Sequence, residues 1–143
     1  MRTFNHNKVF RGSFGKLYVD GERLSNVKSF EAKVSIDYED VIVNGYLGTK
    51  KRPIGYSISG TMTLHKFDSF ILNKYKDALR TGDFPDITMD AIMDDPTAYG
   101  RESIRLNDVT FDEITLSKFE NKTMTEEEVP FAAGEFDVGD TIE

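Results

Sequence analysis

Hydrophobic and polar residues alternate along two long segments of the chain. In residues 23–38 the apolar and aromatic side chains fall at every second position from Phe30 to Tyr38, in the same row as Lys28. In residues 54–67 an apolar row runs from Ile54 to Leu64, interrupted by Gly60. A period of two places one row on each face of a β-strand. Both segments are therefore predicted to be long strands with one buried and one water-facing side, and Gly60 to mark a bend or a close approach of backbones.

The polar rows of these two segments carry hydroxyls and only a few charges. They consist of Ser29, Glu31, Lys33, Ser35 and Asp37 in the first segment, and Ser57, Ser59, Thr61 and Thr63 in the second. Residues 39–53 break the alternation, because they contain Asn44-Gly45, Gly48 and the basic run Lys50-Lys51-Arg52 before Pro53. Such a composition predicts a long loop or an extended hairpin tip between the two strands.

The remaining elements are shorter. Residues 15–19 predict a strand that ends in the tight-turn pair Asp20-Gly21. One helix is expected from a cap at Asp68 or Ser69 to Gly82, with an apolar stripe from Phe67 to Leu79. Strands are predicted at 84–93, within 102–119 and at 129–133. Near Asn107-Asp108 the apolar residues change from one set of alternate positions to the other, which predicts a bulge or a turn. The fold class is mainly β, an antiparallel sandwich or barrel with one flanking helix.

Composition limits the function classes. A chain of 143 residues with 38% hydrophobic residues predicts a single globular domain, 1–143. It has no cysteine, no apolar run long enough to cross a bilayer and no signal-peptide core, so we expect a soluble protein made in the cytoplasm and no membrane partner. The net charge of −7 disfavours tight binding to nucleic acid.

The charge is divided unevenly along the chain. Residues 1–66 carry a balance of +5 and residues 67–143 a balance of −12. Two interpretations stay open: both surfaces are simply solvated, or a basic surface of one subunit meets an acidic surface of a neighbour.

Residues of catalytic type do not form a recognised arrangement. His6 and His65 lack metal-ligand spacing, and Gly48-Thr49-Lys50-Lys51 lacks the spacing of a phosphate loop. Asp94-Asp95 before Pro96 is typical of a turn, and Ser57 and Ser59 have no nearby base. We expect no enzyme activity, no catalytic residue, no metal and no cofactor.

The order of several segments, over nearly the full length, resembles a known family. These segments are a polar N-terminal stretch ending at Arg11-Gly12-Ser13-Phe14-Gly15, then Leu17-Tyr18-Val19-Asp20-Gly21, Lys50-Lys51-Arg52-Pro53 to Ser59-Gly60-Thr61-Met62, the capped helix, Asp108-Val109-Thr110-Phe111-Asp112-Glu113, Glu126-Glu127-Glu128-Val129-Pro130-Phe131, and an acidic terminus. The chain resembles the tail tube proteins of contractile phage tails and phage-tail-like bacteriocins, in the short family of Gram-positive prophages.

The resemblance implies a β-sandwich subunit with a flanking helix, six of which form a ring. The rings would stack head-to-tail into a hollow conduit inside a contractile sheath and share an inner β-barrel. Residues 1–14 would be an N-terminal arm, 39–53 an inter-ring loop and 136–143 an acidic C-terminal tail. The inter-ring contacts would come from Asn44, Gly45, Lys50, Lys51 and Arg52, and the polar rows from Ser29 to Asp37 and from Ser57 to Thr63 would face the lumen.

The partners implied are other copies of the chain, a tail sheath protein, and baseplate and tape-measure proteins. DNA would be passing cargo only, and the location would be a virion tail or tail-like particle assembled in the host cytoplasm. The alternative is a monomeric or dimeric β-sandwich module that uses residues 39–53 for recognition.

Overall fold

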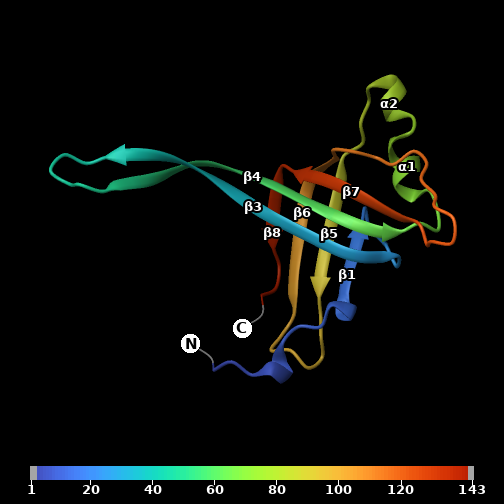
Figure 1. The fold of residues 1–143 in the computed structure, drawn as a ribbon, viewed down its shortest axis with the longest axis horizontal. Coiled ribbons are helices and arrows are strands. Elements are labelled where there is room, and N and C mark those ends of the chain that lie inside the picture. Colours follow the sequence, from blue (N-terminus) through green and yellow to red (C-terminus); the bar gives the residue numbers. More distant parts are fainter. Residues whose placement is uncertain (1–2, 142–143) are drawn as a thin grey trace.

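The computed structural model describes residues 3–141, which form two layers of antiparallel strands (Figure 1). The first layer contains β1 (Gly15–Val19), β2 (Glu22–Arg23), β5 (Ile87–Met93), most of β6 (Glu102–Phe111) and β8 (Glu135–Val138). The second layer contains β3 (Val27–Ile42), β4 (Thr49–His65) and β7 (Glu126–Ala133). Strands of the second layer run across those of the first. The predicted antiparallel sandwich is confirmed.

Strand β6 joins the two layers. Its first part pairs with β5, whereas Thr110 and Phe111 pair with β7. A register shift interrupts the pairing with β5 between Leu106 and Val109, and Asp108 there has a φ of 54°. A bulge of this kind bends a strand and changes which face its side chains occupy. The phase shift predicted near Asn107-Asp108 is therefore confirmed.

The core lies between the layers. Its fully buried side chains include Val19 and Met89 from the first layer and Met62, Val129 and Phe131 from the second. Phe30 stacks on Phe131 with ring centroids 5.7 Å apart. The predicted apolar rows therefore face the core where the strands lie over the first layer.

The turn between β1 and β2 has the predicted chemistry. Asp20 and Gly21 have φ values of 51° and 83°, and Val19 pairs with Glu22 directly across the turn. Two successive residues with positive φ match the right-handed twist of a hairpin. The prediction of a tight hairpin at Asp20-Gly21 is confirmed.

The helical region differs from the single helix that was predicted. It contains α1 (Phe70–Tyr75) and α2 (Ala78–Thr81), which break at Lys76 and Asp77. The cap at Asp68 is present, because its Oδ1 accepts a hydrogen bond from the Phe70 N–H, and Gly82 ends the region with a φ of 79°. Phe67, which precedes α1, and Leu79 in α2 are exposed, so the buried stripe is narrower than predicted and consists of Ile71, Tyr75 and Ala78.

Several boundaries also need correction. The strand predicted at 84–93 begins at Ile87, and the run predicted at 102–119 ends as a strand at Phe111. The C-terminal tail 136–143 is not wholly an extension, since β8 pairs with β6 along Glu135–Val138. Residues 1–2 of the predicted N-terminal arm and 142–143 of the tail lie outside the described residues. Within residues 3–141, no helix has the length and apolar character that a membrane span requires.

Candidate functional site

The most distinctive feature is the hairpin of β3 and β4, which projects far beyond the two layers (Figure 1). The two strands pair continuously from Val27 opposite Leu64 to Ile42 opposite Thr49. Burial ends at Ile58 in β4, and every residue of the hairpin from Glu31 to Ser57 is exposed. We call residues 36–56 the arm. A two-stranded hairpin without a packed face is at best marginally stable in water, so contact with a partner would stabilise the arm.

Of the two structures predicted for residues 39–53, a long loop or an extended hairpin tip, the structure shows the extended hairpin tip. The strands continue through most of it, and only residues 43–48 form the turn. The predicted turn pair is nevertheless present, since Gly45 has a φ of 82° and the Tyr46 N–H donates to the Val43 carbonyl. The loop was predicted because its residues include Gly, Asn and consecutive charges, but pairing between two solvated strands tolerates charged side chains on both faces. The predicted strands 23–38 and 54–67 accordingly become 27–42 and 49–65.

The basic run belongs to β4 and not to a loop. Lys50, Lys51 and Arg52 stand opposite Val41, Asp40 and Glu39 of β3. The Lys50 ammonium lies 5.0 Å from the centre of the Tyr46 ring. Opposite charges on facing strands stabilise a hairpin modestly. Facing positions in the outer part of the arm therefore carry opposite charges, and Lys50 adds a further positive charge near the tip. The sequence alone did not indicate that the basic residues face acidic ones.

The polar rows come together on one face of the hairpin. The register places Ser29, Glu31, Lys33 and Ser35 opposite Thr63, Thr61, Ser59 and Ser57, and Asp37 opposite Gly55. The structure thus brings all nine predicted lumen residues to a common surface. Lys28 is the exception to the predicted rows: a register shift between Val27 and Ser29 turns it to the polar side, where its Nζ donates to Glu126 Oε1 at 2.8 Å. This contact lowers the pKa of Glu126.

The opposite face of the arm is apolar and exposed. Ile36 pairs with Tyr56, and Tyr38 pairs with Pro53. The exposed fractions of Ile36, Tyr38 and Tyr56 lie between 50% and 55%. Alternation predicted burial for these residues, but the first layer does not extend beneath them. Their burial must come from outside the chain or not at all.

Both edges of the arm lack a neighbouring strand among residues 3–141. Strand β3 pairs only with β4 along its length, and β4 pairs with β7 only from Ile58 to His65. Residues 49–57 of β4 therefore have a free edge on the side away from β3. Exposed long edges are templates for pairing with another chain.

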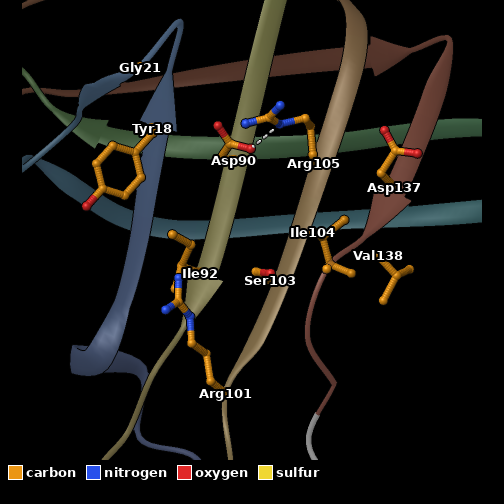
Figure 2. A pocket seen from close by; sticks show the side chains of 11 residues that line it. Tyr18, Gly21, Asp90, Ile92, Arg101, Ser103, Ile104, Arg105, Asp137 and Val138 are labelled. Carbon is orange, nitrogen blue, oxygen red and sulfur yellow. Dashed lines mark hydrogen bonds and ion pairs between the residues drawn. The ribbon is translucent and has the colours of Figure 1, made fainter.

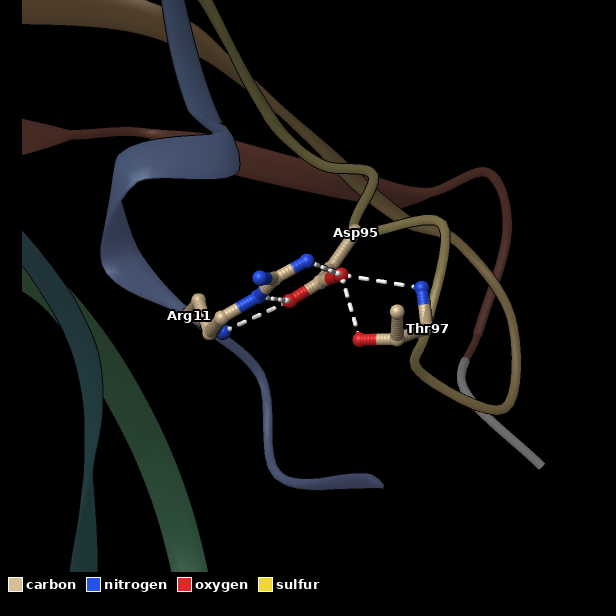
Figure 3. Close-up of polar contacts among 3 residues, drawn as sticks. All are labelled: Arg11, Asp95 and Thr97. Carbon is tan, nitrogen blue, oxygen red and sulfur yellow. Dashed lines mark hydrogen bonds and ion pairs between the residues drawn. The ribbon is translucent and has the colours of Figure 1, made fainter. Parts of the chain in front are cut away.

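The N-terminal segment is held to the body by one carboxylate. The Asp95 side chain has no exposed surface, and it accepts hydrogen bonds from the Arg11 backbone N–H, Nε and Nη2 at 2.9–3.0 Å (Figure 3). The Thr97 N–H and hydroxyl donate to its Oδ1. The bonds from Arg11 lower the pKa of Asp95 far below its ordinary range, with those from Thr97 adding to the effect, and the same pairing raises the pKa of Arg11. Asp94-Asp95 does form part of a turn, as predicted, but sequence did not indicate its long-range role.

Replacing Asp95 with Asn is expected to release the N-terminal segment. The amide cannot accept both charge-assisted bonds from the guanidinium, so trypsin should cleave after Lys8 and Arg11 faster in Asp95→Asn than in the unaltered chain.

The pH dependence of the same contact follows from the pKa of Asp95. Because the folded pKa of Asp95 is lowered, the stability that its carboxylate contributes to the fold is complete above the unfolded pKa of about 4 and is lost only as the pH falls through the lower folded value. The N-terminal segment of the unaltered chain should consequently be cleaved slowly at every pH between neutral and mildly acidic. At the lower pH values the rate is measured with an acid-tolerant protease. Asp94→Asn, at an exposed position, is the matched control, and equal cleavage rates in the two variants would contradict the assignment.

The outer face of the first layer carries an open depression of about 530 Å³ (Figure 2). Asp90 and Arg105 face each other there on neighbouring strands, and Arg105 Nε donates to Asp90 Oδ1 at 2.8 Å. This bond raises the pKa of Arg105. Arg101 pairs with Asp140 at 3.8 Å, and Asp137 accepts from the Asn107 amide. The two arginines of the depression each have an acidic partner, as on a solvated β-surface.

The described residues bring no three His, Cys, Asp or Glu side chains together in a group that could hold a metal ion. His65 lies at the exposed end of β4, and His6 lies in the short 3₁₀ turn His6–Lys8 near the N-terminus, so the two histidines belong to separate parts of the chain. Ser57 and Ser59 lie in the polar row opposite Ser35 and Lys33.

Comparison with known proteins decides the family. A family model described as phage tail tube protein matches residues 2–140. The phage-like element PBSX protein XkdM of Bacillus subtilis strain 168 is 32% identical over 133 residues, which cover 92% of this chain and 90% of that protein. The chain belongs to the phage tail tube protein family. The resemblance seen in the sequence is confirmed, and the chain is a structural tail tube subunit.

Two solved structures share the fold of this family member. A chain of the sheath–tube complex of an extracellular contractile injection system, in its extended state, superposes with a TM-score of 0.74 and 10% identity, covering 95% of both chains. A chain of the anti-feeding prophage cap superposes with a TM-score of 0.76 and 8% identity, covering 98% of this chain and 97% of that one. At such low identity the likeness shows that the fold is common to them.

Sequence reasoning missed three features of the assembly surfaces. They are the exposed apolar face of the arm, the hydrogen bonds from Arg11 to Asp95, and the contact of Phe136 in β8 with Tyr56 at the base of the arm. The ring centroids of Phe136 and Tyr56 lie 6.2 Å apart. One signal was available for the first: the apolar alternation from Phe30 to Tyr38 is longer than the usual strand of ~5–6 residues. The other two depend on contacts between residues far apart in the chain, for which no local pattern exists.

Proposed function

We propose that six copies of the chain form a ring and that rings stack head-to-tail into the inner tube of a contractile tail or tail-like particle. The observation that carries the proposal is the arm, which has two free edges and two exposed faces beyond the body of the subunit. Pairing of the free β3 edge with a neighbour's free β4 edge would join adjacent subunits in one sheet and remove both edges from solvent. Closure of such a sheet into a barrel leaves no edge at all.

The polar face of the hairpin is the proposed lumen wall. Its nine residues carry four serines, two threonines and the charges of Glu31, Lys33 and Asp37. Lys33 lies in the same row as Glu31 and Asp37, so its positive charge has acidic neighbours on the same face. A hydroxyl-rich, weakly acidic wall offers little attraction to phosphates, which suits a conduit through which DNA passes without binding.

The other proposed partners are proteins outside and at the end of the tube. A sheath protein would cover the outside of the tube, and baseplate and tape-measure proteins would meet its end and its lumen. In support, the structural neighbours come from a sheath–tube complex and from a tube cap. The particle would be assembled in the host cytoplasm.

Electron microscopy of the purified chain tests this proposal. Negative staining is expected to show six-fold rings or tubes, and a monomer or dimer that persists at high concentration would favour the alternative of a binding module. We further expect the variant Lys50→Glu, Lys51→Glu, Arg52→Glu to form short tubes or none.

Because the triple reversal also places like charges opposite Glu39 and Asp40, it needs a matched control. The exchange variant Glu39→Arg, Asp40→Lys, Lys51→Asp, Arg52→Glu keeps opposite charges across the hairpin and changes only which strand presents each sign. It is expected to stack poorly as well. Tubes of normal length from the exchange variant would show that the basic residues serve the hairpin alone and not the inter-ring contact.

A further inference from the structure

Two exposed apolar clusters lie on turns at opposite ends of the molecule. The tip cluster consists of Ile42, Val43, Tyr46 and Leu47 at the end of the arm, and Leu47 there is fully exposed. The loop cluster consists of Phe67 together with Leu116, Phe119 and Met124, and Phe119 and Met124 are 87% and 82% exposed. Single exposed apolar residues are ordinary, but several large ones gathered on one short segment are typical of an interaction surface.

The segment that carries the loop cluster is fixed at both ends. It joins β6 to β7 through residues 112–125, which is much longer than the usual connection of ~4–6 residues. Ile114 packs against the core at its start. At its end the Lys66 N–H donates to the Thr125 carbonyl at 2.8 Å, and Lys66 Nζ donates to the largely buried Glu127 at 2.5 Å. A long segment that is anchored at both ends loses less conformational freedom on binding than one with a free end.

The positions of the two clusters suit a contact between successive copies. Along the longest axis of the molecule, the turn 43–48 lies at one end and the orange segment 112–125 lies at the other (Figure 1). Repeating the subunit along this axis would bring the turn of one copy toward segment 112–125 of the next. Contacts between two different surfaces of identical chains are heterologous, and they continue indefinitely when the repeat does not close on itself.

The charges around the clusters are of opposite sign. The tip is followed by Lys50, Lys51 and Arg52, of which Lys51 and Arg52 stand opposite Asp40 and Glu39, so residues 39–52 carry a balance of +1. Residues 112–128 hold six acidic side chains and two lysines; Glu126 and Glu127 are paired within the chain with Lys28 and Lys66. This leaves Asp112, Glu113, Glu120 and Glu128 beside Lys118 and Lys122, a surface that remains acidic. Complementary charges around an apolar centre favour one orientation of docking.

We propose that the tip cluster of one copy docks on the loop cluster of a copy in the adjacent ring. The inference rests on the proposed stacking of rings and names the surface that receives the arm. It also assigns a role to the −12 balance of the C-terminal half, part of which lies in segment 112–128.

Cross-linking between introduced cysteines tests the proposed contact, because the chain has no cysteine of its own. Tubes of the double variant Leu47→Cys, Phe119→Cys, treated with a short bismaleimide, should give a ladder of covalent multimers on a denaturing gel. The matched control is Leu47→Cys, Val9→Cys, whose second site is also an exposed apolar residue but lies in the N-terminal segment. It should stay monomeric on the gel.

The outcomes separate this inference from the proposed function. Tubes of the double variant that give no ladder, or a ladder of equal strength in the control, would overturn the docking of tip on loop while leaving the tube intact. Absence of tubes from the unaltered chain would instead overturn the proposed function. If the double variant does not assemble, the single variants Leu47→Cys and Phe119→Cys are co-assembled with excess unaltered chain. Cross-linking should then give only a band of two chains, and absence of that band would overturn the inference.

Discussion

A chain that lacks the arm is expected to fold normally and to remain monomeric. Ser35 stands opposite Ser57, so replacing residues 36–56 with Asn-Gly would close the shortened hairpin with a two-residue turn. The core is untouched, because buried residues in β4 begin at Ile58. The deletion removes the exposed apolar face, the outer part of the free β3 edge, nearly all of the free β4 edge and the tip cluster together. Light scattering should therefore report the mass of one chain, and electron microscopy should show no tubes.

A smaller deletion separates ring formation from stacking. Replacing only residues 43–48 with Asn-Gly joins the facing pair Ile42 and Thr49 and keeps both edges of the arm. This variant is expected to form rings that stack poorly. Tubes from the chain without residues 36–56 would contradict the assignment of the arm as the assembly element, and a loss of cooperative thermal unfolding in that chain would contradict its placement outside the core.

Gly60→Ala is expected to lower the stability of the chain strongly. Gly60 pairs with Ala32 on one side and with Phe131 on the other. A Cβ at this position would collide with the Glu31 backbone carbonyl and would lie 2.6 Å from Phe131 Cζ. The carbonyl is fixed by the sheet and Phe131 is fully buried beneath it, so neither can move without breaking the packing of the two layers.

Overpacking at such a site costs about 3 kcal/mol or more, a large part of the stability of a small domain. The free energy of unfolding, measured with urea under conditions that keep the chain monomeric, should fall by that amount. Gly12→Ala is the matched control, because a Cβ there meets nothing within 4 Å. A loss of less than 1 kcal/mol in Gly60→Ala would show that the backbones can separate at this crossing, contrary to the close approach described above.

Local patterns predicted most of the fold because the features concerned depend on neighbours in sequence. Alternation identified β3 and β4. The Asp20-Gly21 pair, whose residue types accept a positive φ, identified the hairpin turn, and Gly82 identified the end of the helical region. Gly60 was also recognised as unusual from its place in an apolar row. The family could be inferred from the order of such segments, since order is a property of the sequence itself.

Errors arose where a local pattern has two tertiary outcomes. A charged segment rich in Gly and Asn forms a loop if it stands alone and a strand if a partner strand is available, and residues 39–53 have that partner. The acidic tail likewise has an edge of β6 on which β8 forms. The predicted helix is broken at Lys76 and Asp77, although the buried Ile71, Tyr75 and Ala78 keep the spacing of one helical face, and no local pattern marks the break.

The sequence by itself determined which residues share a face, because a period of two is a local property of an extended chain. Only the tertiary structure decided which of those faces is buried within the subunit. Phe30 and Ile36 belong to the same apolar row, yet Phe30 stacks on Phe131 while Ile36 is half exposed on the arm. The physical reason is that burial requires an opposing layer, and the layer ends where the arm begins. Beyond that point the row is exposed in the single chain, and we propose that another copy of the chain covers it.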